Sequence, residues 1–222
     1  MAGVDRRAVE GTAGPLPTAA GGLTRRNYGI KEAKGKDGRI IVQRGGGILR
    51  VRPDGTELEV YCTGLRNPFD IAVDPFLNLF TRDNTNDRAG WDTRVSHLMQ
   101  TANYGYTQVF ANFTDETMPT LGTFGGGGGT GGLFVQDPRW AENYRNTLFT
   151  GDWGRSEVYR HELKPHGSTF DLKQEVFLKV PRATGMDIDA DGRLYVASWR
   201  GARRVSTSGR TSGSSRALPR RD

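Results

Sequence analysis

The sequence predicts an all-β fold, an incomplete β-propeller, and three observations support this prediction. Three runs recur with the same order of apolar, β-branched and polar residues: LFTRDN at 79–84, LFTGDW at 148–153 and LYVASW at 194–199. Two further segments alternate apolar and polar residues and end at a Pro-x-Gly turn, ILRVRPDG at 48–55 and VYRHELKPHG at 158–167. Glycine supplies 31 of 222 residues, about twice its usual share, which is typical of a turn-rich chain.

Each segment has a local reason to be a strand. Alternation at 48–52 gives one buried face, and proline followed by glycine ends the strand. Residues 57–64 and 173–180 follow the two Pro-x-Gly turns as further short strands. Residues 69–78 and 185–193 each combine a short strand with an Asp-centred turn. The apolar and β-branched openings of the recurring runs favour strands over helices.

The common unit is a meander of about four strands repeated every ~45–70 residues, which is typical of a propeller blade. A solenoid or a β-sandwich would also use short repeated strands, and both stay open at this point. At roughly 40–50 residues per blade, residues 26–200 hold about three to four blades. We therefore expect part of a larger ring.

An insertion from about residue 104 to 140 contains the run GGGGGTGG at 125–132. A phosphate-binding loop needs Lys-Ser or Lys-Thr after its last glycine, and Leu133 follows instead. We interpret the run as a flexible or close-packed loop.

The ends of the chain differ from its middle. We expect a disordered or linker N-terminus at 1–25, a partial propeller domain at 26–200 and a disordered basic tail at 201–222. The tail holds six arginines against one aspartate, a net +5 of the chain's +6. It is too poor in apolar residues to order itself. Basic tails bind phosphates non-specifically, so a nucleic-acid hypothesis depends on the tail alone, and we expect no specific nucleic-acid partner.

No apolar stretch approaches the ~20 residues that span a bilayer, and the N-terminus lacks the apolar core of a secretion signal. The single cysteine, Cys62, has no partner for an internal disulfide, and we expect a half-buried strand residue. HELKP at His161 has proline where a zinc protease needs its second histidine. His161 and His166 flank a turn, so we predict that both lie on the surface.

Residues 64–108 contain the densest set of chemically useful side chains. Arg66 and Asn67 precede the rigid Pro68 and should lie at the mouth of the strand 70–73, where an arginine can pair with a carboxylate or phosphate. The run DNTND at 83–87 gathers oxygen donors that suit a hard cation such as Ca²⁺. A purely structural role, in which the arginine caps the strand and the Asx residues form turns, stays open.

The order of these motifs resembles the soluble quinoprotein glucose dehydrogenase and sorbosone dehydrogenase family. The resemblance is carried by GGGILRVRPDG, GLRNPFDIAVDPFLNLF, the Asx-rich turn and ANYGY, followed by residues 146–163 and 183–199 as two later blades. It implies a six-bladed propeller that binds pyrroloquinoline quinone (PQQ) and Ca²⁺ and oxidises sugar hydroxyls. The chain resembles still more closely the propeller region of bacterial membrane-bound dehydrogenases that carry a fused c-type cytochrome domain.

The resemblance implies a role for individual residues. Arg66 and Asn67 match an Arg-Asn step that contacts the quinone, and Asn84 matches a polar cofactor contact. Thr85 and Asn86 match residues whose backbone carbonyls bind the calcium. Gly154 or Arg155 matches the position of a cofactor-contacting lysine, whose charge Arg155 would replace, and Arg182 lies near the last cofactor arginines.

One part of the pattern is missing. The family's general base is a histidine in a blade upstream of GGGILRV, and this chain has no histidine before His97. Nothing in the resemblance makes His97 its replacement, so no catalytic residue is assigned. Beyond Trp199 the blade pattern dissolves into the Arg/Ser tail.

Three functional hypotheses follow. The first is a PQQ- and calcium-dependent sugar or alcohol dehydrogenase, or a fragment of one, with a c-type cytochrome as electron acceptor and a haem on a fused domain. The family is exported, which implies a periplasmic or extracellular protein. The second is a non-catalytic NHL-like propeller that presents a surface for a ligand or a protein. The third is nucleic-acid binding through the tail.

Overall fold

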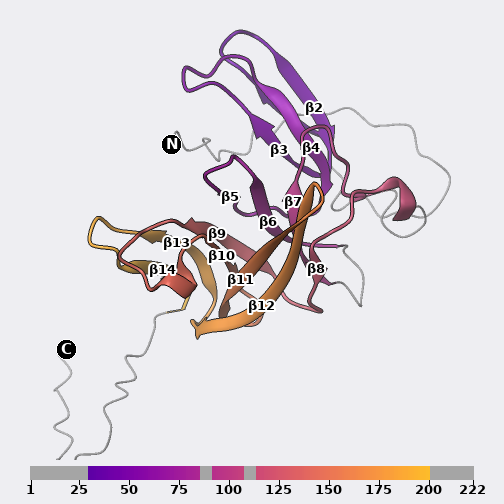
Figure 1. Cartoon of the computed structure of the whole chain (residues 1–222). Helices are drawn as coiled ribbons and strands as arrows, with labels where there is room; N and C mark the ends of the chain where they lie inside the picture. Colours follow the sequence, from indigo (N-terminus) through magenta and orange to yellow (C-terminus); the bar gives the residue numbers. More distant parts are fainter. Residues whose placement is uncertain (1–29, 86–91, 108–113, 201–222) are drawn as a thin grey trace, which may run out of the picture.

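The computed structural model describes residues 30–85, 92–107 and 114–200, with no side-chain detail for residues 30 and 31, and these residues form an all-β structure (Figure 1). The predicted end segments 1–25 and 201–222 lie outside the described residues. Within the described part there is no α-helix, only two short 3₁₀ turns. No helix in this part is long and apolar enough to cross a bilayer.

Two sheets have four antiparallel strands each, in the orders β5-β6-β7-β8 and β9-β10-β11-β12. We call them the first blade and the second blade. Three hairpins accompany them, β1–β2, β3–β4 and β13–β14. The strands are β1 (Ile30–Lys34), β2 (Ile40–Arg44), β3 (Gly46–Arg50), β4 (Glu59–Leu65), β5 (Ala72–Val73), β6 (Leu79–Asn84), β7 (Thr93–Leu98), β8 (Gly122–Thr123), β9 (Gly129–Val135), β10 (Thr147–Asp152), β11 (Glu157–His166), β12 (Thr169–Lys179), β13 (Ala183–Ile188) and β14 (Leu194–Ser198); the 3₁₀ turns are Thr114–Glu116 and Glu142–Tyr144.

The predicted meander is confirmed, because neighbours in each sheet are consecutive in sequence. The first strands β5, β9 and β13 begin at residues 72, 129 and 183, a spacing within the predicted ~45–70 residues. With the hairpins β3–β4 and β13–β14 as partial blades, the described residues form about four units. In Figure 1 these units follow one another across the molecule in chain order.

The three recurring runs occupy equivalent places. LFTRDN is β6, LFTGD is the end of β10, and LYVAS is β14, so each run is the second strand of its unit. Every residue of β7 and β10 is buried, and five of the six in β6. Sheets covered on both faces have no polar side for charged residues, so a charge on these strands must find its partner inside.

The prediction of a loop for the glycine run was wrong for residues 129–132, which begin strand β9. The strand is rich in glycine because neighbouring backbones approach it closely. A Cβ on Gly129 would lie 2.4 Å from the carbonyl oxygen of Arg82, and one on Gly132 would lie 3.2 Å from the amide nitrogen of Ala72. The run therefore packs the second blade against the first.

The surface prediction is correct for His166 and wrong for His161. His161 is fully buried because it lies inside the sheet, between Leu148 of β10 and Gln174 of β12, and its Nε2 lies 2.8 Å from the Thr150 hydroxyl. Burial lowers the pKa of His161 well below the usual value for histidine. Cys62 is also more buried than expected, 1% exposed, and burial raises the pKa of its thiol to about 11, which makes it unreactive.

Candidate functional site

The predicted cofactor residues gather where strands β6 and β10 end and β9 begins. We call this edge the rim and define it as residues 66–67, 84, 124–128, 152–155 and 182. Asn67 accepts the backbone N–H of Asn84 at 3.0 Å. The Asn84 amide then donates to the Gly127 carbonyl at 3.0 Å, and the side chain is 3% exposed. Asn84 therefore connects the loop after β4 with the glycine loop of the second blade.

The glycine loop is held by Asp152 and Arg155. Oδ1 of Asp152 accepts the backbone N–H of Gly128 at 3.0 Å and that of Arg155 at 2.9 Å. The Arg155 guanidinium donates from Nε to the Gly126 carbonyl at 2.7 Å and from Nη2 to the Phe124 carbonyl at 2.6 Å. Together these contacts fix the position of Arg155 on the rim.

Arg182 reaches the same edge from the turn between the second blade and β13. Its guanidinium carbon lies 3.9 Å from the centre of the Trp153 ring, and Nη1 donates to the Trp153 carbonyl at 3.2 Å. A cation stacked on a tryptophan face is held by the ring's quadrupole. Trp153 follows Asp152 directly, so Arg182 joins the same group of residues.

Two buried ion pairs lie under the rim, and neither was predicted from the sequence. Arg94 donates from Nε to Asp83 at 2.8 Å, and Arg82 donates from Nη2 to Asp152 at 3.2 Å. Arg82 and both aspartate side chains are fully buried, and that of Arg94 is 5% exposed. Burial lowers the pKa of Arg82, and the Asp152 charge opposes that shift. Removing only one partner of such a pair costs about 3–5 kcal/mol.

Arg66 lies on the rim through the first of these pairs, because its backbone N–H donates to Asp83 Oδ2 at 2.9 Å. One signal in the sequence marked the acidic members of the pairs: Asp83 and Asp152 are the fifth residues of LFTRD and LFTGD. An acidic residue at the same place in two buried strands needs a counterion.

The predicted calcium ligands are only partly described. The backbone N–H of Thr85 donates to the Asp92 carbonyl at 2.8 Å, and the Thr85 hydroxyl accepts the Asp92 N–H at 3.0 Å. Asn86 lies outside the described residues. Among the residues that the structure describes, no group of three or more His, Cys, Asp or Glu side chains is arranged to hold a metal. Calcium binding through Thr85 and Asn86 remains a prediction.

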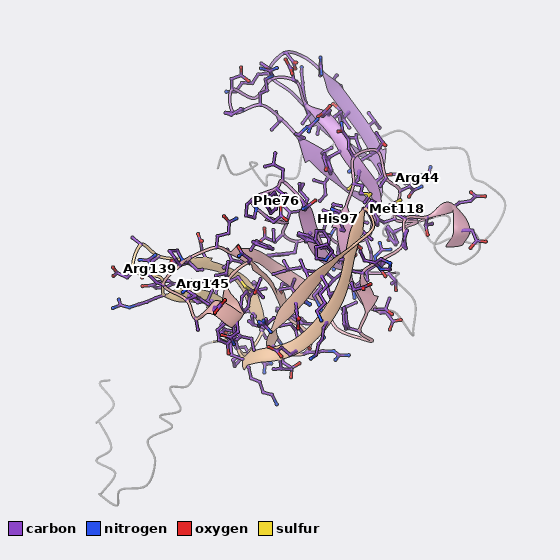
Figure 2. All side chains as sticks on the ribbon, in the orientation of Figure 1. Arg44, Phe76, His97, Met118, Arg139 and Arg145 are labelled. Carbon is purple, nitrogen blue, oxygen red and sulfur yellow. The ribbon has the colours of Figure 1, made fainter. Side chains whose placement is uncertain are left out.

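None of the chain's three histidines lies on the rim. His97 pairs with Phe80 across β6–β7 and His161 pairs with Leu148 across β10–β11. Each of these two histidines therefore lies four residues from the rim end of its strand, a distance of about 13 Å. His97 lies where the β11–β12 hairpin crosses β7, with Nδ1 3.2 Å from the Thr169 hydroxyl (Figure 2). His166 is exposed in that hairpin, paired with Asp171.

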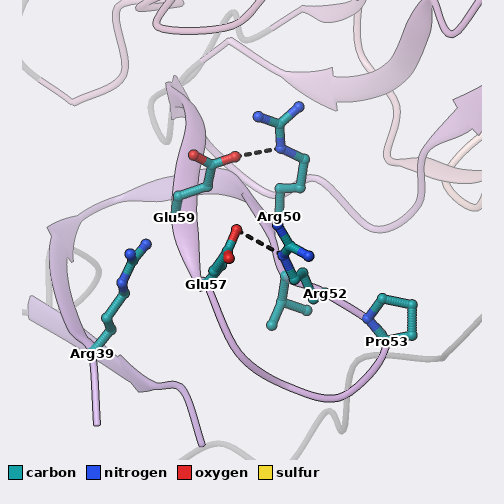
Figure 3. A pocket seen from close by; sticks show the side chains of 7 residues that line it. Arg39, Arg50, Arg52, Pro53, Glu57 and Glu59 are labelled. Atoms are coloured by element: carbon teal, nitrogen blue, oxygen red, sulfur yellow. Dashed lines mark hydrogen bonds and ion pairs between the residues drawn. The ribbon is translucent and has the colours of Figure 1, made fainter. Parts of the chain in front are cut away.

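Two cavities lie away from the rim. One of about 420 Å³ lies beside β3 and β4, and its arginines Arg50 and Arg52 are paired with Glu59 and Glu57 (Figure 3). The other, of about 430 Å³, lies at the opposite end of the strands, beside Phe76 and the β11–β12 turn. The first has little uncompensated charge to offer an anion.

The rim suits a polyanionic ligand. Arg66, Arg155 and Arg182 come from three different segments, whereas the aspartates beneath them are neutralised by Arg94 and Arg82. Cationic side chains and backbone amides held in place recognise carboxylates through charge-assisted hydrogen bonds. The residues present therefore fit a rigid ligand with several carboxylates, which is the chemistry of PQQ.

No protein-family model matches the chain, and no curated protein matches it. Several solved structures match the chain. A glucose dehydrogenase superposes with a TM-score of 0.54 at 20% identity over 77% of this chain and 60% of its own. A second glucose dehydrogenase superposes with a TM-score of 0.54 at 19% identity, over 75% of this chain and 59% of its own. The PQQ-bound aldose sugar dehydrogenase of Streptomyces coelicolor superposes with a TM-score of 0.54 at 16% identity, over 78% of this chain and 57% of its own.

These comparisons show the fold. The chain has the propeller-type architecture of sugar dehydrogenases, which confirms the predicted fold class. It spans 57–60% of the length of these neighbours. Folds of this kind carry many functions, so function depends on the residues of the site.

Proposed function

We propose that the chain is a PQQ-dependent sugar or alcohol dehydrogenase-like propeller whose rim binds the quinone. The observation that carries the proposal is the chain of hydrogen bonds from Asn67 through Asn84 to the glycine loop that holds Arg155. These residues are far apart in sequence, and each was predicted as a cofactor contact from the resemblance. Their junction at one edge is what a shared ligand requires.

The rim residues would have separate tasks. Arg66, Arg155 and Arg182 would bind the carboxylates of the quinone, and Asn67 and Asn84 would fix its orientation. Thr85 and Asn86 would supply oxygens to a calcium ion beside it. When bound, a quinone of this class accepts a hydride from the carbon that bears a sugar or alcohol hydroxyl group.

The first prediction is that PQQ with Ca²⁺ raises the melting temperature. A ligand at one hundred times its Kd adds about 2.7 kcal/mol of stability, or roughly 5–10 °C for a chain of this size. Arg66→Ala removes a charged hydrogen bond worth about 1.5–3 kcal/mol and should reduce the rise to about half or less. Differential scanning fluorimetry with and without each ligand measures this.

The control is Arg193→Ala, in the β13–β14 turn beside Asp191, which should leave the rise intact. A wild-type chain that shows no shift at saturating PQQ and Ca²⁺ overturns the proposal. Omitting calcium separates the metal's contribution from that of the quinone.

The position of the histidines favours a second candidate, a non-catalytic NHL-like propeller that binds a ligand or a protein. All three lie away from the rim, so the described rim offers no imidazole base for a hydroxyl proton. Reduction of an artificial electron acceptor by the PQQ-loaded chain in the presence of a sugar panel would reject this candidate.

The remaining expectations belong to the same proposal. An exported, periplasmic or extracellular protein that passes electrons to a c-type cytochrome, with a haem on a fused domain, is implied by the resemblance. Substrate-dependent reduction of added cytochrome c by the PQQ-loaded chain, followed by absorbance, tests the electron transfer.

A further inference from the structure

Asp83 and Asp152 occupy the same place in the repeat. Each is the fifth residue of an LFT-x-D run, one near the end of β6 and the other at the end of β10. Both are fully buried. A carboxylate recurring at one position of two sheets, without a single exposed oxygen, calls for an explanation beyond strand formation.

Each carboxylate accepts the backbone N–H of a rim arginine. Asp83 Oδ2 accepts from Arg66 at 2.9 Å, and Asp152 Oδ1 accepts from Arg155 at 2.9 Å. Arg66 precedes its aspartate in the chain, whereas Arg155 follows its own. The contact of Arg155 closes the turn that follows β10, whereas the contact of Arg66 joins residues 17 positions apart in the sequence.

Each carboxylate also has a buried arginine as its counterion. Arg94 donates two hydrogen bonds to Asp83, from Nε to Oδ1 at 2.8 Å and from Nη2 to Oδ2 at 3.2 Å. Arg82 contacts Asp152 at 3.2 Å and crosses between blades to Gln174 of β12 at 2.6 Å. The rings of Phe124 and Tyr159 lie 5.2 and 4.7 Å from the Arg82 guanidinium.

The turn aspartates of the chain show the contrast. Asp74 accepts the N–H groups of Phe76 and Asn78, and Asp189 accepts those of Asp191 and Arg193. Within the described residues, neither Asp74 nor Asp189 forms a salt bridge with a buried arginine. Holding a turn therefore does not require the buried counterion.

We propose that Asp83 and Asp152 are positioning residues that hold Arg66 and Arg155 for a polycarboxylate ligand, while Arg94 and Arg82 cancel their charge. The ligand class rests on the proposed function; the positioning does not. A carboxylate without its counterion would attract the rim arginines inward and offset their charge. When a buried arginine neutralises it, the carboxylate fixes the backbone of its rim arginine and leaves the positive charge of the rim in place.

Two double variants isolate the contact at Asp152. Arg82→Met/Asp152→Asn removes both buried charges and keeps an oxygen that accepts the Arg155 N–H. Arg82→Met/Asp152→Ala removes the charges and that oxygen. Asp74→Ala is the matched control, because Asp74 is a buried amide acceptor at the opposite end of β6.

Amide hydrogen exchange in the ligand-free protein is the first measurement. Arg155 lies in an exposed turn, so its amide exchanges slowly only if Asp152 holds it. We expect at least tenfold faster exchange at Arg155 and Gly128 in the alanine double variant, and rates within threefold of wild type in the asparagine double variant. Asp74→Ala should leave both amides unchanged.

The second measurement is the affinity for PQQ in the presence of Ca²⁺. It is made well below the melting temperature of each variant. The alanine double variant should bind at least tenfold more weakly, and the asparagine double variant within threefold of wild type. A folded alanine variant with wild-type exchange and affinity overturns the inference. If that variant does not fold, an Arg155 amide in wild type that exchanges at the rate of an unstructured peptide overturns it equally.

The two proposals fail in different ways. Protected amides in a wild-type chain that does not bind PQQ overturn the proposed cofactor and support the positioning of the arginines. Tight PQQ binding with an unprotected Arg155 amide supports the cofactor and overturns the positioning.

Discussion

At the scale of single residues, burial decides what the polar groups can do. His161 and His97 both have a lowered pKa, mainly because burial disfavours the charged imidazolium. Neither is therefore a charged group at neutral pH. Their role in the described structure is to fill the interior, with His97 stacked on Phe80 at 5.3 Å.

This burial makes stability depend on pH. The unfolded chain protonates its histidines near pH 6.5, whereas His161 stays neutral in the fold well below that pH. Lowering the pH through 6.5 therefore favours the unfolded state. We expect the free energy of unfolding to fall by about 1.4 kcal/mol between pH 7.5 and 5.5 for His161 alone, measured by urea denaturation.

His161→Gln should remove that part of the pH dependence, whatever it does to absolute stability. His97→Gln should remove a further part. Equal slopes for wild type and His161→Gln would contradict the prediction.

At the scale of elements, strand β9 shows what periodicity misses. An alternating pattern needs side chains, and residues 125–129 are all glycine, so a strand starting at Gly129 leaves little trace in the sequence. The recurring runs, by contrast, predicted β6, β10 and β14 within a residue or two of their bounds. His161 was misplaced because a turn motif nearby suggested exposure, whereas β11 continues to His166.

The glycine run therefore contains both essential and replaceable positions. A Cβ on Gly129 would lie 2.4 Å from the Arg82 carbonyl oxygen, whereas one on Gly126 would meet nothing within 4 Å. We expect Gly129→Ala to destabilise the fold by about 1–3 kcal/mol through overpacking. Gly126→Ala should be neutral or stabilising by up to about 1 kcal/mol, because it restricts the unfolded chain.

Chemical denaturation of both variants against wild type decides the matter. Equal stabilities would mean that β9 and β6 can separate at no cost. That result would contradict the close packing of the two blades.

At the scale of the whole molecule, the order of the motifs predicted the fold. Of the residues that the resemblance implied as cofactor contacts, Arg66, Asn67, Asn84, Arg155 and Arg182 lie on the rim, and their role stays a prediction. The buried pairs under the rim could not be predicted in the same way. Arg82 and Arg94 look like surface charges on alternating strands, and only packing on both faces of the first blade encloses them. Their partners are 70 and 11 residues away, so for Arg82 the sequence offers no local clue.

Within the described residues, one strand edge has no partner strand. Of the described strands, β14 pairs with β13 alone, and Tyr195 and Trp199 nearby are 58% and 77% exposed. Exposed apolar edges promote association between chains. We expect concentration-dependent self-association by sedimentation velocity, weakened in Tyr195→Lys/Trp199→Lys. Phe76→Lys, at an exposed turn, should have no effect, and a monomer at every concentration would contradict the prediction.

The stacking of Arg182 on Trp153 has an optical consequence. Trp153 is 40% exposed, and a guanidinium covers one of its faces, so its emission depends on where that cation lies. A ligand that draws Arg182 away changes the surroundings of this one indole. Trp153, one of the chain's four tryptophans, would thus give a label-free signal for a ligand that binds at the rim.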